Sequence, residues 1–313
     1  MTPPMLQIIG VQGIAEVTAG DDLARLITAA VDLQDGDVVV VSSKILSKAQ
    51  GRTVTPAAGE TPDQARRRLS LDHEVLAQTP HFVVVRTPEG WVCANAGLDA
   101  SNMPDGGVLL LPEDCDGAAA AIRDRLSATA QVAVIISDTF GRAWREGQSD
   151  VALGVAGMSA LRDERGNRDR DGRELAVTLI AVADQVAGAA DLVRDKAAGL
   201  PVVVVRGLGH LVGHHGSGAE LVRPPDTDLF AHGRGWLARR LATGVGRKVR
   251  SGTPPEWEWD LVLRAAGGGQ RVGGQLTTAD GLVAGRAEAC LLDLGYGVDL
   301  EHRDGHYLVT VKA

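Results

Sequence analysis

The sequence contains few aromatic residues and few cysteines. Phe, Trp and Tyr together make up 3% of its 313 residues while hydrophobic residues reach 44%, so Val, Leu, Ile and Ala must build the core. The three cysteines, Cys93, Cys115 and Cys290, are far apart in the chain and form no CxxC pair. That spacing excludes a disulfide framework and a cysteine-rich zinc site, and it predicts a protein of the reducing cytoplasm.

A long apolar run and a surplus of basic residues are also missing. No apolar run approaches the ~20 residues that a membrane-spanning helix needs, and the first residues, MTPPMLQIIG, lack the pattern of a signal peptide. The net charge of -8 argues against a general nucleic-acid binder. We therefore expect neither a membrane nor a nucleic acid as a partner, whereas a local basic pocket can still hold an anionic ligand.

Common nucleotide-binding and catalytic motifs are absent as well. No GxxxxGK[ST] motif occurs, which argues against a P-loop NTPase, and no GxSxG motif occurs, which argues against a serine hydrolase. The segment 202–213, VVVVRGLGHLVG, does not satisfy GxGxxG because Val212 stands where the third glycine belongs. His210, His214 and His215 lack a cysteine or acidic partner at zinc spacing, which favours a glycine-rich loop.

Short runs of β-branched residues are interspersed with helical patterns. Strands buried on both faces are expected at 37–41, 82–85, 132–136, 179–183 and 202–205, and helices at 21–33, 115–129 and 184–198. The mixture predicts an α/β or α+β fold. The charged segment 162–174 is interpreted as a solvated loop.

The composition changes near Gly244, where Gly, Pro and charged residues predict a linker. Thr253 and Glu256 have the spacing of a capping box, so a helix is expected to begin there. The last residues alternate in polarity around Asp304-Gly305, which predicts a hairpin. We therefore divide the chain into a domain of residues 1–246 and a small C-terminal α/β lobe of residues 247–313, to which no chemistry is assigned.

The first segment that could carry chemistry is VVVVSSKILSKAQGR, residues 38–52. A buried strand is followed by Ser42, Ser43 and Lys44, and Lys48 comes one helical turn later. Hydroxyl, ammonium and backbone N–H groups at the end of a strand suit phosphate oxygens. A polar loop with ordinary surface lysines is the alternative.

The second segment is NAGLDASN, residues 95–102, which follows a predicted strand. Its carboxylate and amide oxygens, among them those of Asp99 and Asn102, are ligands that Mg²⁺ and Mn²⁺ prefer. The same residue types also favour an Asx turn, so the segment alone leaves both interpretations open.

The third segment is ISDTFGRAWREGQSDVALG, residues 136–154. Asp138 and Thr139 follow a buried apolar run, and an acid at the end of a strand is a common ligand of a divalent ion. Arg142 and Arg145 can pair with carboxylate or phosphate oxygens. The alternative is a helix cap followed by structural ion pairs.

Taken together, these segments resemble those of the coenzyme F420 γ-glutamyl ligases, including the N-terminal ligase domain of the bifunctional actinobacterial enzymes. The matching pieces are VVVVSSKILSKAQGR, NAGLDASN, ISDTFGRAWREGQSDVALGVAG, RGNRDRDGREL, ADQVAGAADLV and PVVVVRG. They occur in the order of the family and extend over residues 5–243. Each piece is moderately specific, and their ordered combination is much more so.

The resemblance implies a mixed α/β fold without a P-loop and a GTP-dependent ligase activity. Members of the family join L-glutamate to the terminal carboxylate of a deazaflavin coenzyme precursor and then add further γ-linked glutamates. The resemblance also implies a homodimer that needs Mg²⁺ or Mn²⁺, with two ions expected. An acyl phosphate would activate the carboxylate, because a free carboxylate is a poor electrophile. Transfer of the phosphoryl group would depend mainly on positioning and charge neutralisation.

The same resemblance suggests roles for individual residues. As metal ligands it suggests Asp99, Asp138 and Thr139. As contacts to GTP it suggests Ile14, Ala15, Glu16, Ser43, Lys44, Lys48, Asn102, Arg206, Gly207 and Leu208. Arg142, Arg145 and Asp150 are assigned to the substrate side from their chemistry.

The chain departs from the family pattern in three places. Ala143 replaces an expected proline, and the segment RDERGNR lacks an expected tyrosine. The bifunctional enzymes also carry a flavin-binding domain of ~200 residues after the ligase, and too few residues follow Gly246 for such a fold. We therefore expect no flavin.

Two other functions remain open at this point. A phosphotransferase acting on a related anionic substrate would use the same metal and GTP site. A non-catalytic nucleotide-binding protein is the third possibility, with the C-terminal lobe as its interaction surface.

Overall fold

The computed structural model describes residues 5–78, 82–100, 106–194, 199–224, 227–228, 254, 256–272, 274–279, 284, 287–288, 291, 296 and 298–311. The chain forms two compact units, Met1–Leu229 and Phe230–Ala313. The domain boundary that the sequence predicts at residue 246 lies outside the described residues. Among the described residues, no helix has both the length and the apolar character needed to cross a membrane.

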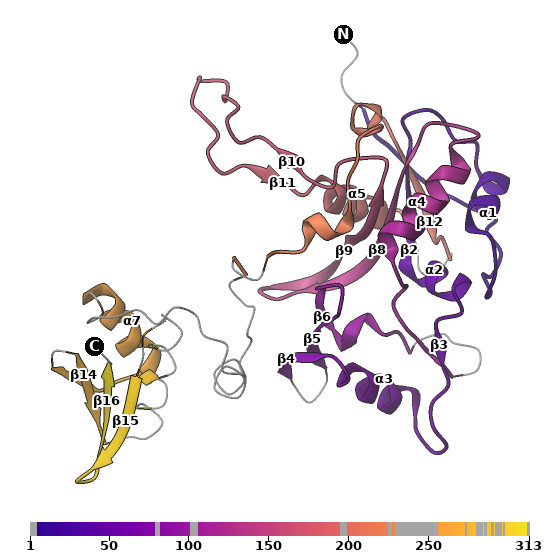
Figure 1. Cartoon of the computed structure of the whole chain (residues 1–313). Helices are drawn as coiled ribbons and strands as arrows, with labels where there is room; N and C mark the ends of the chain where they lie inside the picture. The colour runs from indigo at the N-terminus through magenta and orange to yellow at the C-terminus, as the bar shows by residue number, and fades with distance from the viewer. Residues whose placement is uncertain are drawn as a thin grey trace. The chain divides into compact units, whose positions relative to one another are not determined.

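A five-stranded mixed sheet forms the centre of the first unit (Figure 1). Its strands, in spatial order, are β1 (Gln7–Gly10), β12 (Val202–Arg206), β2 (Val38–Ser42), β8 (Ala133–Arg142) and β9 (Arg145–Ala156). Only β2 and β8 are parallel neighbours, and the other pairs are antiparallel. The C-terminal end of β2 and the start of β12 therefore lie side by side at one end of the sheet, since Val41 pairs with Val202.

Alternate side chains of the sheet enter two separate cores. Val39 and Val41 pack with helices α1 (Leu23–Ala30), α2 (Ser43–Ala49) and α4 (Cys115–Leu126). Val38 and Val40 pack on the opposite face with helix α5 (Val182–Asp191). All four valines are fully buried, which confirms the prediction of a strand covered on both faces and of a mixed α/β fold.

One predicted strand is wrong in most of its length. The run 179–183 forms only the two-residue strand β11 (Leu179–Ile180), and α5 begins at Val182. The reason is the spacing of the apolar residues that follow, because they repeat every three or four positions and so form one face of a helix against the second core. These residues are Val182, Ala183, Val186, Ala187 and Ala190.

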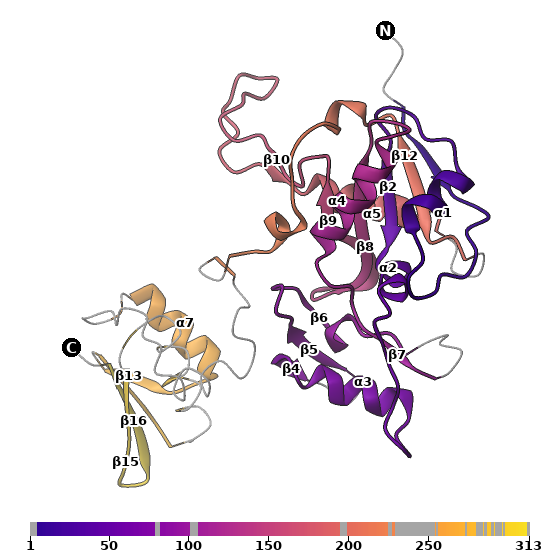
Figure 2. The same cartoon turned by 45° about the vertical axis from the view of Figure 1, so that its right-hand side comes forward.

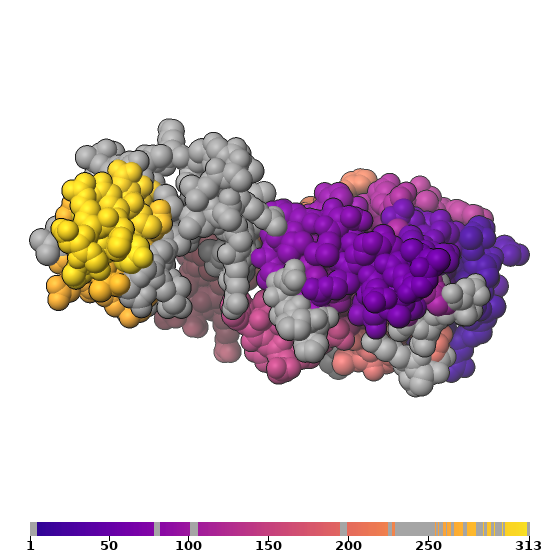
Figure 3. Space-filling model, turned by 90° about the horizontal axis from the view of Figure 1, so that it is seen from below, coloured from indigo at the N-terminus to yellow at the C-terminus, as the bar shows by residue number. Residues whose placement is uncertain are grey.

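A smaller layer is inserted between α2 and α4 and lies below the five-stranded sheet in Figures 1 and 2. It contains α3 (Pro62–Ser70), the antiparallel strands β4 (Glu74–Gln78), β5 (Val83–Arg86) and β6 (Val92–Ala94), the 3₁₀ turn η1 (Asn95–Gly97), and the short pair β3 (Thr53–Val54) and β7 (Val108–Leu109). Its own core includes Ala65, Val83 and Leu98. Seen from below, this layer forms much of the surface of the first unit (Figure 3).

The charged segment 162–174 is largely exposed, as predicted for solvated chain. It starts with strand β10 (Arg162–Asp163), which pairs with β11, and so extends from the sheet as a long hairpin (Figure 1). Two 3₁₀ turns, η2 (Gly209–Leu211) and η3 (Gly218–Leu221), follow β12.

The second unit has its own core and its own sheet. Helix α7 (Glu256–Ala266) begins at the last residue of the predicted start signal, whose Thr253 lies outside the described residues. The antiparallel order is β13 (Gln270–Val272), β14 (Gln275–Thr278), β16 (His306–Val311) and β15 (Val298–Arg303). Asp304 and Gly305 have φ angles of 50° and 77° between β15 and β16, which confirms the predicted hairpin. Trp259 is fully buried in the core of this unit.

Candidate active site

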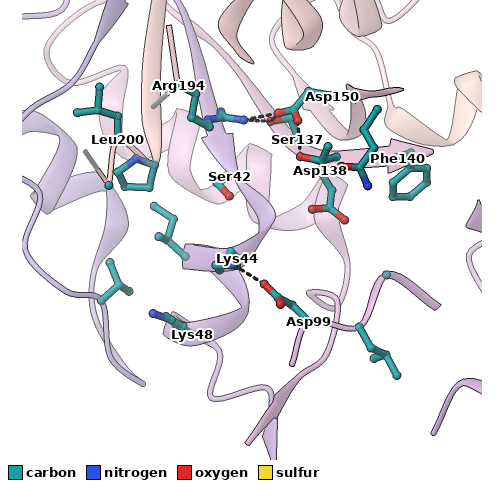
Figure 4. A pocket seen from close by; sticks show the side chains of 18 of the residues that line it. Ser42, Lys44, Lys48, Asp99, Ser137, Asp138, Phe140, Asp150, Arg194 and Leu200 are labelled. Carbon is teal, nitrogen blue, oxygen red and sulfur yellow. Dashed lines mark hydrogen bonds and ion pairs between the residues drawn. The ribbon is translucent and has the colours of Figure 1, made fainter. Parts of the chain in front are cut away.

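A cavity of about 640 Å³ lies at the edge of the sheet where β2 ends (Figure 4). Most of its lining comes from four parts of the first unit, namely the start of the chain near Ile14, the β2–α2 junction, the β6–η1 segment and the β8–β9 hairpin, and Arg66 and Arg194 add to it. The segment Gly199–Pro201 closes one side, because β12 starts at this edge. Segments far apart in the sequence therefore converge on one concave site.

The apolar run suggests that the strand ends at Ile136, but the strand that carries Asp138 continues beyond it. Strand β8 continues to Arg142 and pairs with β9, so that Thr139 lies opposite Asp150. The pairing satisfies the backbone of the polar residues, and the end of the apolar run marks only the end of the covered part of the strand. Asp138 therefore lies within a strand, with its neighbours pointing to the other face.

Asp138 faces the cavity from β8. The hydroxyl of Ser43 donates a hydrogen bond of 2.9 Å to Asp138 Oδ1. Burial raises the pKa of Asp138 to about 6, and the nearby carboxylates of Asp150 and Asp99 add to the rise. A desolvated carboxylate close to other carboxylates is a favourable ligand for a cation, which would offset the buried negative charge.

Asp99 reaches the same cavity from the smaller layer. Its backbone N–H and C=O pair with Leu109 at 3.0 and 2.8 Å, which fixes the position of the carboxylate. Asn95 and Ala96 before it adopt left-handed φ angles of 51° and 54°, a costly conformation for alanine that turns the chain toward the cavity. Asp99 forms an ion pair with Lys44 across the cavity (Figure 4).

The lysines of α2 line the cavity one helical turn apart. Lys44 contacts Asp99, and Lys48 forms an ion pair with Glu16, which stands beside Ile14 and Ala15 in the cavity wall. Ser43 is buried and contacts Asp138 instead. The structure therefore brings together two carboxylates, two ammonium groups and the N-terminal segment, all of which the sequence assigned to metal or GTP.

Asp150 is buried beneath the cavity and accepts three polar contacts. The hydroxyls of Ser137 and Thr139 donate to it at 2.9 and 2.7 Å. Arg194 forms an ion pair with it and also donates to Ser137 at 3.1 Å. Because the Thr139 hydroxyl donates its hydrogen bond to Asp150, the lone pairs of the Thr139 oxygen remain available as acceptors.

Other predicted residues lie elsewhere. Arg142 and Arg145 are exposed at the tip of the β8–β9 hairpin, and Arg142 donates to the backbone carbonyl of Gly147 at 3.4 Å. Neither arginine lines the cavity, so their assignment to the substrate stays a prediction. Asn102 lies outside the described residues.

Arg206, Gly207 and Leu208 also lie away from the cavity. They follow the far end of β12, because β12 runs antiparallel to β2 and only its start is at the cavity edge. Arg206 instead binds Asp37 with two hydrogen bonds of 2.8 Å. The structure does not bring this segment to the other candidate nucleotide contacts.

Several lining residues carried no clear signal in the sequence. Arg194 follows an amphipathic helix, where a surface charge is the ordinary expectation, and Ser137 and Gln148 are ordinary strand residues until β8 and β9 pair. Cys93 also lines the cavity, and burial raises its pKa to about 12, so its thiol stays protonated. Among the described residues, no group of three His, Cys, Asp or Glu side chains is placed to hold a metal ion. A cation site here would thus combine two carboxylates with hydroxyl oxygens.

The site defines a class of protein before any comparison: an α/β protein whose cavity joins cationic and carboxylate side chains without a P-loop. The model of the F420-0:Gamma-glutamyl ligase family matches residues 13–207. The matched segment contains every residue named above as lining the cavity. The chain belongs to this family, as the sequence resemblance predicted.

Individual relatives agree with the family match. Coenzyme F420:L-glutamate ligase of Haloarcula marismortui is 42% identical over 247 residues, which cover 72% of this chain and 95% of that protein. The ligase of the same description from Methanothermobacter thermautotrophicus is 43% identical over 249 residues, covering 72% and 98% of the two chains. That of Archaeoglobus fulgidus is 39% identical over 242 residues, covering 72% and 96%.

Proposed function

We propose that this protein joins L-glutamate to the carboxylate of coenzyme F420-0 at the expense of GTP, and then adds further γ-linked glutamates. Membership of the family supports the ligase reaction. The observation that carries the proposal is the convergence of Lys44, Lys48, Asp99 and Asp138 on one cavity, because this set can hold phosphate groups together with the cation that accompanies them.

The reaction needs activation because a carboxylate is a poor electrophile. A carboxylate oxygen of the coenzyme precursor attacks the γ-phosphorus of GTP, the bond to the β-phosphate oxygen breaks, and an acyl phosphate and GDP form. The amine of glutamate then attacks the acyl carbon, inorganic phosphate leaves, and the amine loses a proton as the amide forms. The protein contributes chiefly position and charge neutralisation to both steps.

Mg²⁺ or Mn²⁺ fits the residues at the bottom of the cavity. Asp99 and Asp138 would hold one ion, and Thr139, which points to the other face of β8, would contribute to a second, since all three offer hard oxygen atoms. Burial, with a smaller contribution from the nearby carboxylates, raises the pKa of Asp138, and a bound cation would offset the cost of its charge. When bound, the ion would screen the charge of the transferred phosphoryl group.

Other groups of the chain prepare the site for nucleotide. Ser43 holds the Asp138 carboxylate in place, and Asp150 orients the Thr139 hydroxyl. Lys44 and Lys48 would exchange their present acidic partners for phosphate oxygens, with Ile14–Glu16 beside the nucleotide. A homodimer working in the cytoplasm completes the proposal.

The test is product mass after incubation with the deazaflavin precursor, GTP, Mn²⁺ and L-glutamate. We expect a ladder of glutamate-sized increments that Asp99→Asn abolishes, while the exposed Asp124→Asn on α4 leaves it intact. GTP consumption without any increment would contradict ligation and favour a phosphotransferase. Neither increment nor GTP consumption would leave a binding protein.

A further inference from the structure

Arg194 lines the cavity with only part of its guanidinium group in use. Its side chain is 10% exposed, and its Nη1 contacts both Asp150 and Ser137 (Figure 4). Its Nε and Nη2 are buried and have no hydrogen-bond partner within the described part of the chain. A buried charged donor without an acceptor is unfavourable, so two such donors on one side chain call for a ligand.

Nε and Nη2 form one edge of the guanidinium, and other arginines of the protein show what that edge binds. Arg206 grips both oxygens of Asp37 with it at 2.8 Å. Arg68 grips Glu60 in the same way at 2.9 and 3.0 Å, and Arg165 grips Asp163 at 2.8 and 2.6 Å. In each case the acceptor is a planar carboxylate bound through two parallel hydrogen bonds.

The other side of the Arg194 guanidinium is held rigidly. Asp150 is buried and is itself fixed by Ser137 and Thr139, so the position of Nη1, which contacts both Asp150 and Ser137, is set before any ligand arrives. Such preorganisation lowers the entropy cost of binding and selects for geometry. Within the described part of the chain, no acceptor binds the Nε–Nη2 edge of Arg194. This edge is therefore a pair of parallel donors suited to a flat oxyanion.

The position of Arg194 also separates it from the residues proposed for phosphate. Lys44 and Lys48 extend from α2, whereas Arg194 follows α5 and reaches the cavity beside Ser137. Figure 4 places Arg194 and the two lysines on different sides of the cavity, with Ser42 between them. A ligand that extends from the lysines toward Arg194 would therefore present a second anionic group there.

We propose that the Nε–Nη2 edge of Arg194 binds a carboxylate of one of the two substrates that are ligated. Arg194 is then a substrate-binding residue, and Asp150 and Ser137 are its positioning residues. The inference rests on the proposed ligase function and names the group that recognises the carboxylate. The carboxylate can come from L-glutamate or from the coenzyme precursor.

The test compares Arg194→Lys with the matched control Arg68→Lys, which alters the same bidentate geometry on the exposed helix α3. Lysine keeps the positive charge beside Asp150 but removes the two-pronged edge. We expect Arg194→Lys to raise the KM for one carboxylate substrate by about tenfold or more, with the KM for GTP unchanged. Arg68→Lys should leave the KM values for GTP, L-glutamate and the coenzyme precursor unchanged.

The substrate whose KM rises identifies the source of the carboxylate. Equal changes in all three KM values, a change for GTP alone, or no change would each overturn the inference. Arg194→Gln, measured in the same way, replaces Arg194→Lys if that variant does not fold, and thermal unfolding checks both. Product mass from the unaltered protein is measured first, because its failure concerns the ligase proposal and not Arg194.

Discussion

Two arginine–aspartate pairs, each with a buried aspartate, lie at opposite ends of the strands of the central sheet, and they differ in how many of the arginine donors have a partner. At the edge away from the cavity, Arg206 binds both oxygens of Asp37, and Asp37 also accepts the backbone N–H of Gln34 at 2.8 Å. At the cavity edge, Arg194 binds Asp150 through Nη1 alone. Both aspartate side chains are completely buried.

We interpret the Arg206–Asp37 pair as a contribution to stability and the Arg194–Asp150 pair as part of the functional site. Asp37 raises the pKa of Arg206 through their hydrogen bonds, and the pair links β12 to the turn before β2. Every donor and acceptor drawn into that contact serves the fold. At the cavity edge the acid is fully bonded while the arginine retains unpartnered donors, an arrangement that is unfavourable for the isolated chain and useful to a ligand.

The same contrast appears in single carboxylates. Asp163 is exposed, and its hydrogen bonds with Arg165 lower its pKa to about 2. Asp138, in the cavity, has its pKa raised to about 6, first by burial. The cavity therefore keeps a carboxylate in surroundings that disfavour its charge.

The largest expected effect is the loss of ligation in Asp138→Asn. The amide keeps the shape of the side chain and an acceptor for Ser43 but removes the charge. We expect the rate of product formation to fall by about a hundredfold or more, while the melting temperature of the metal-free protein rises. Asp163→Asn, at an exposed site, is the control and should keep full activity. A variant that stays active, or that melts below the unaltered protein, contradicts the contrast.

The reverse behaviour is expected at the other edge. Asp37→Asn removes the charge that binds Arg206, whose side chain is 24% exposed and therefore partly solvated, so the free energy of unfolding should fall by about 2 kcal/mol. Urea denaturation measures this loss, and steady-state kinetics at low temperature should show unchanged KM values. Adding Arg206→Met should restore part of the stability, because it removes the uncompensated charge. A change in KM would give this pair a role in substrate binding.

The pH dependence of stability sharpens the comparison. Because the folded protein raises the pKa of Asp138 from 3.8 to about 6, the contribution of this group to stability is fully present below pH 3.8 and is lost as the pH rises through 6. The metal-free protein should thus be less stable than Asp138→Asn at pH 7, by an amount on the order of 3 kcal/mol. Urea titrations from pH 7 to pH 4 should show this gap closing. A gap that stays constant would mean that Asp138 titrates normally.

Local patterns in the sequence predict the parts of this architecture that depend on neighbouring residues. The run Val38–Val41 indicates a strand covered on both faces, and Asp304-Gly305 indicates a hairpin, since each is determined within a few positions. The motif resemblance also assigns Lys44, Lys48 and Asp99 to one nucleotide and metal site, and in the structure all three line one cavity.

Features set by strand direction and by distant pairing are not encoded locally. The direction of β12 decides that Arg206 lies far from the cavity, and no short pattern contains that direction. Strand β8 continues past Ile136 only because β9 pairs with it. Arg194 and Asp150 are 44 positions apart, so their contact emerges only when α5 packs on the sheet.

The smallest expected effect concerns the second unit. All cavity-lining residues lie in the first unit, and the family match ends at residue 207. Since domains with their own cores fold independently, a chain that ends at residue 229 should keep its ligation rate and its KM values within about twofold. In the full chain, Trp259→Ala should unfold the second unit alone, because Trp259 fills its core. Calorimetry would then show one lost transition with unchanged activity, whereas a large fall in rate in either variant would make the second unit part of the working enzyme.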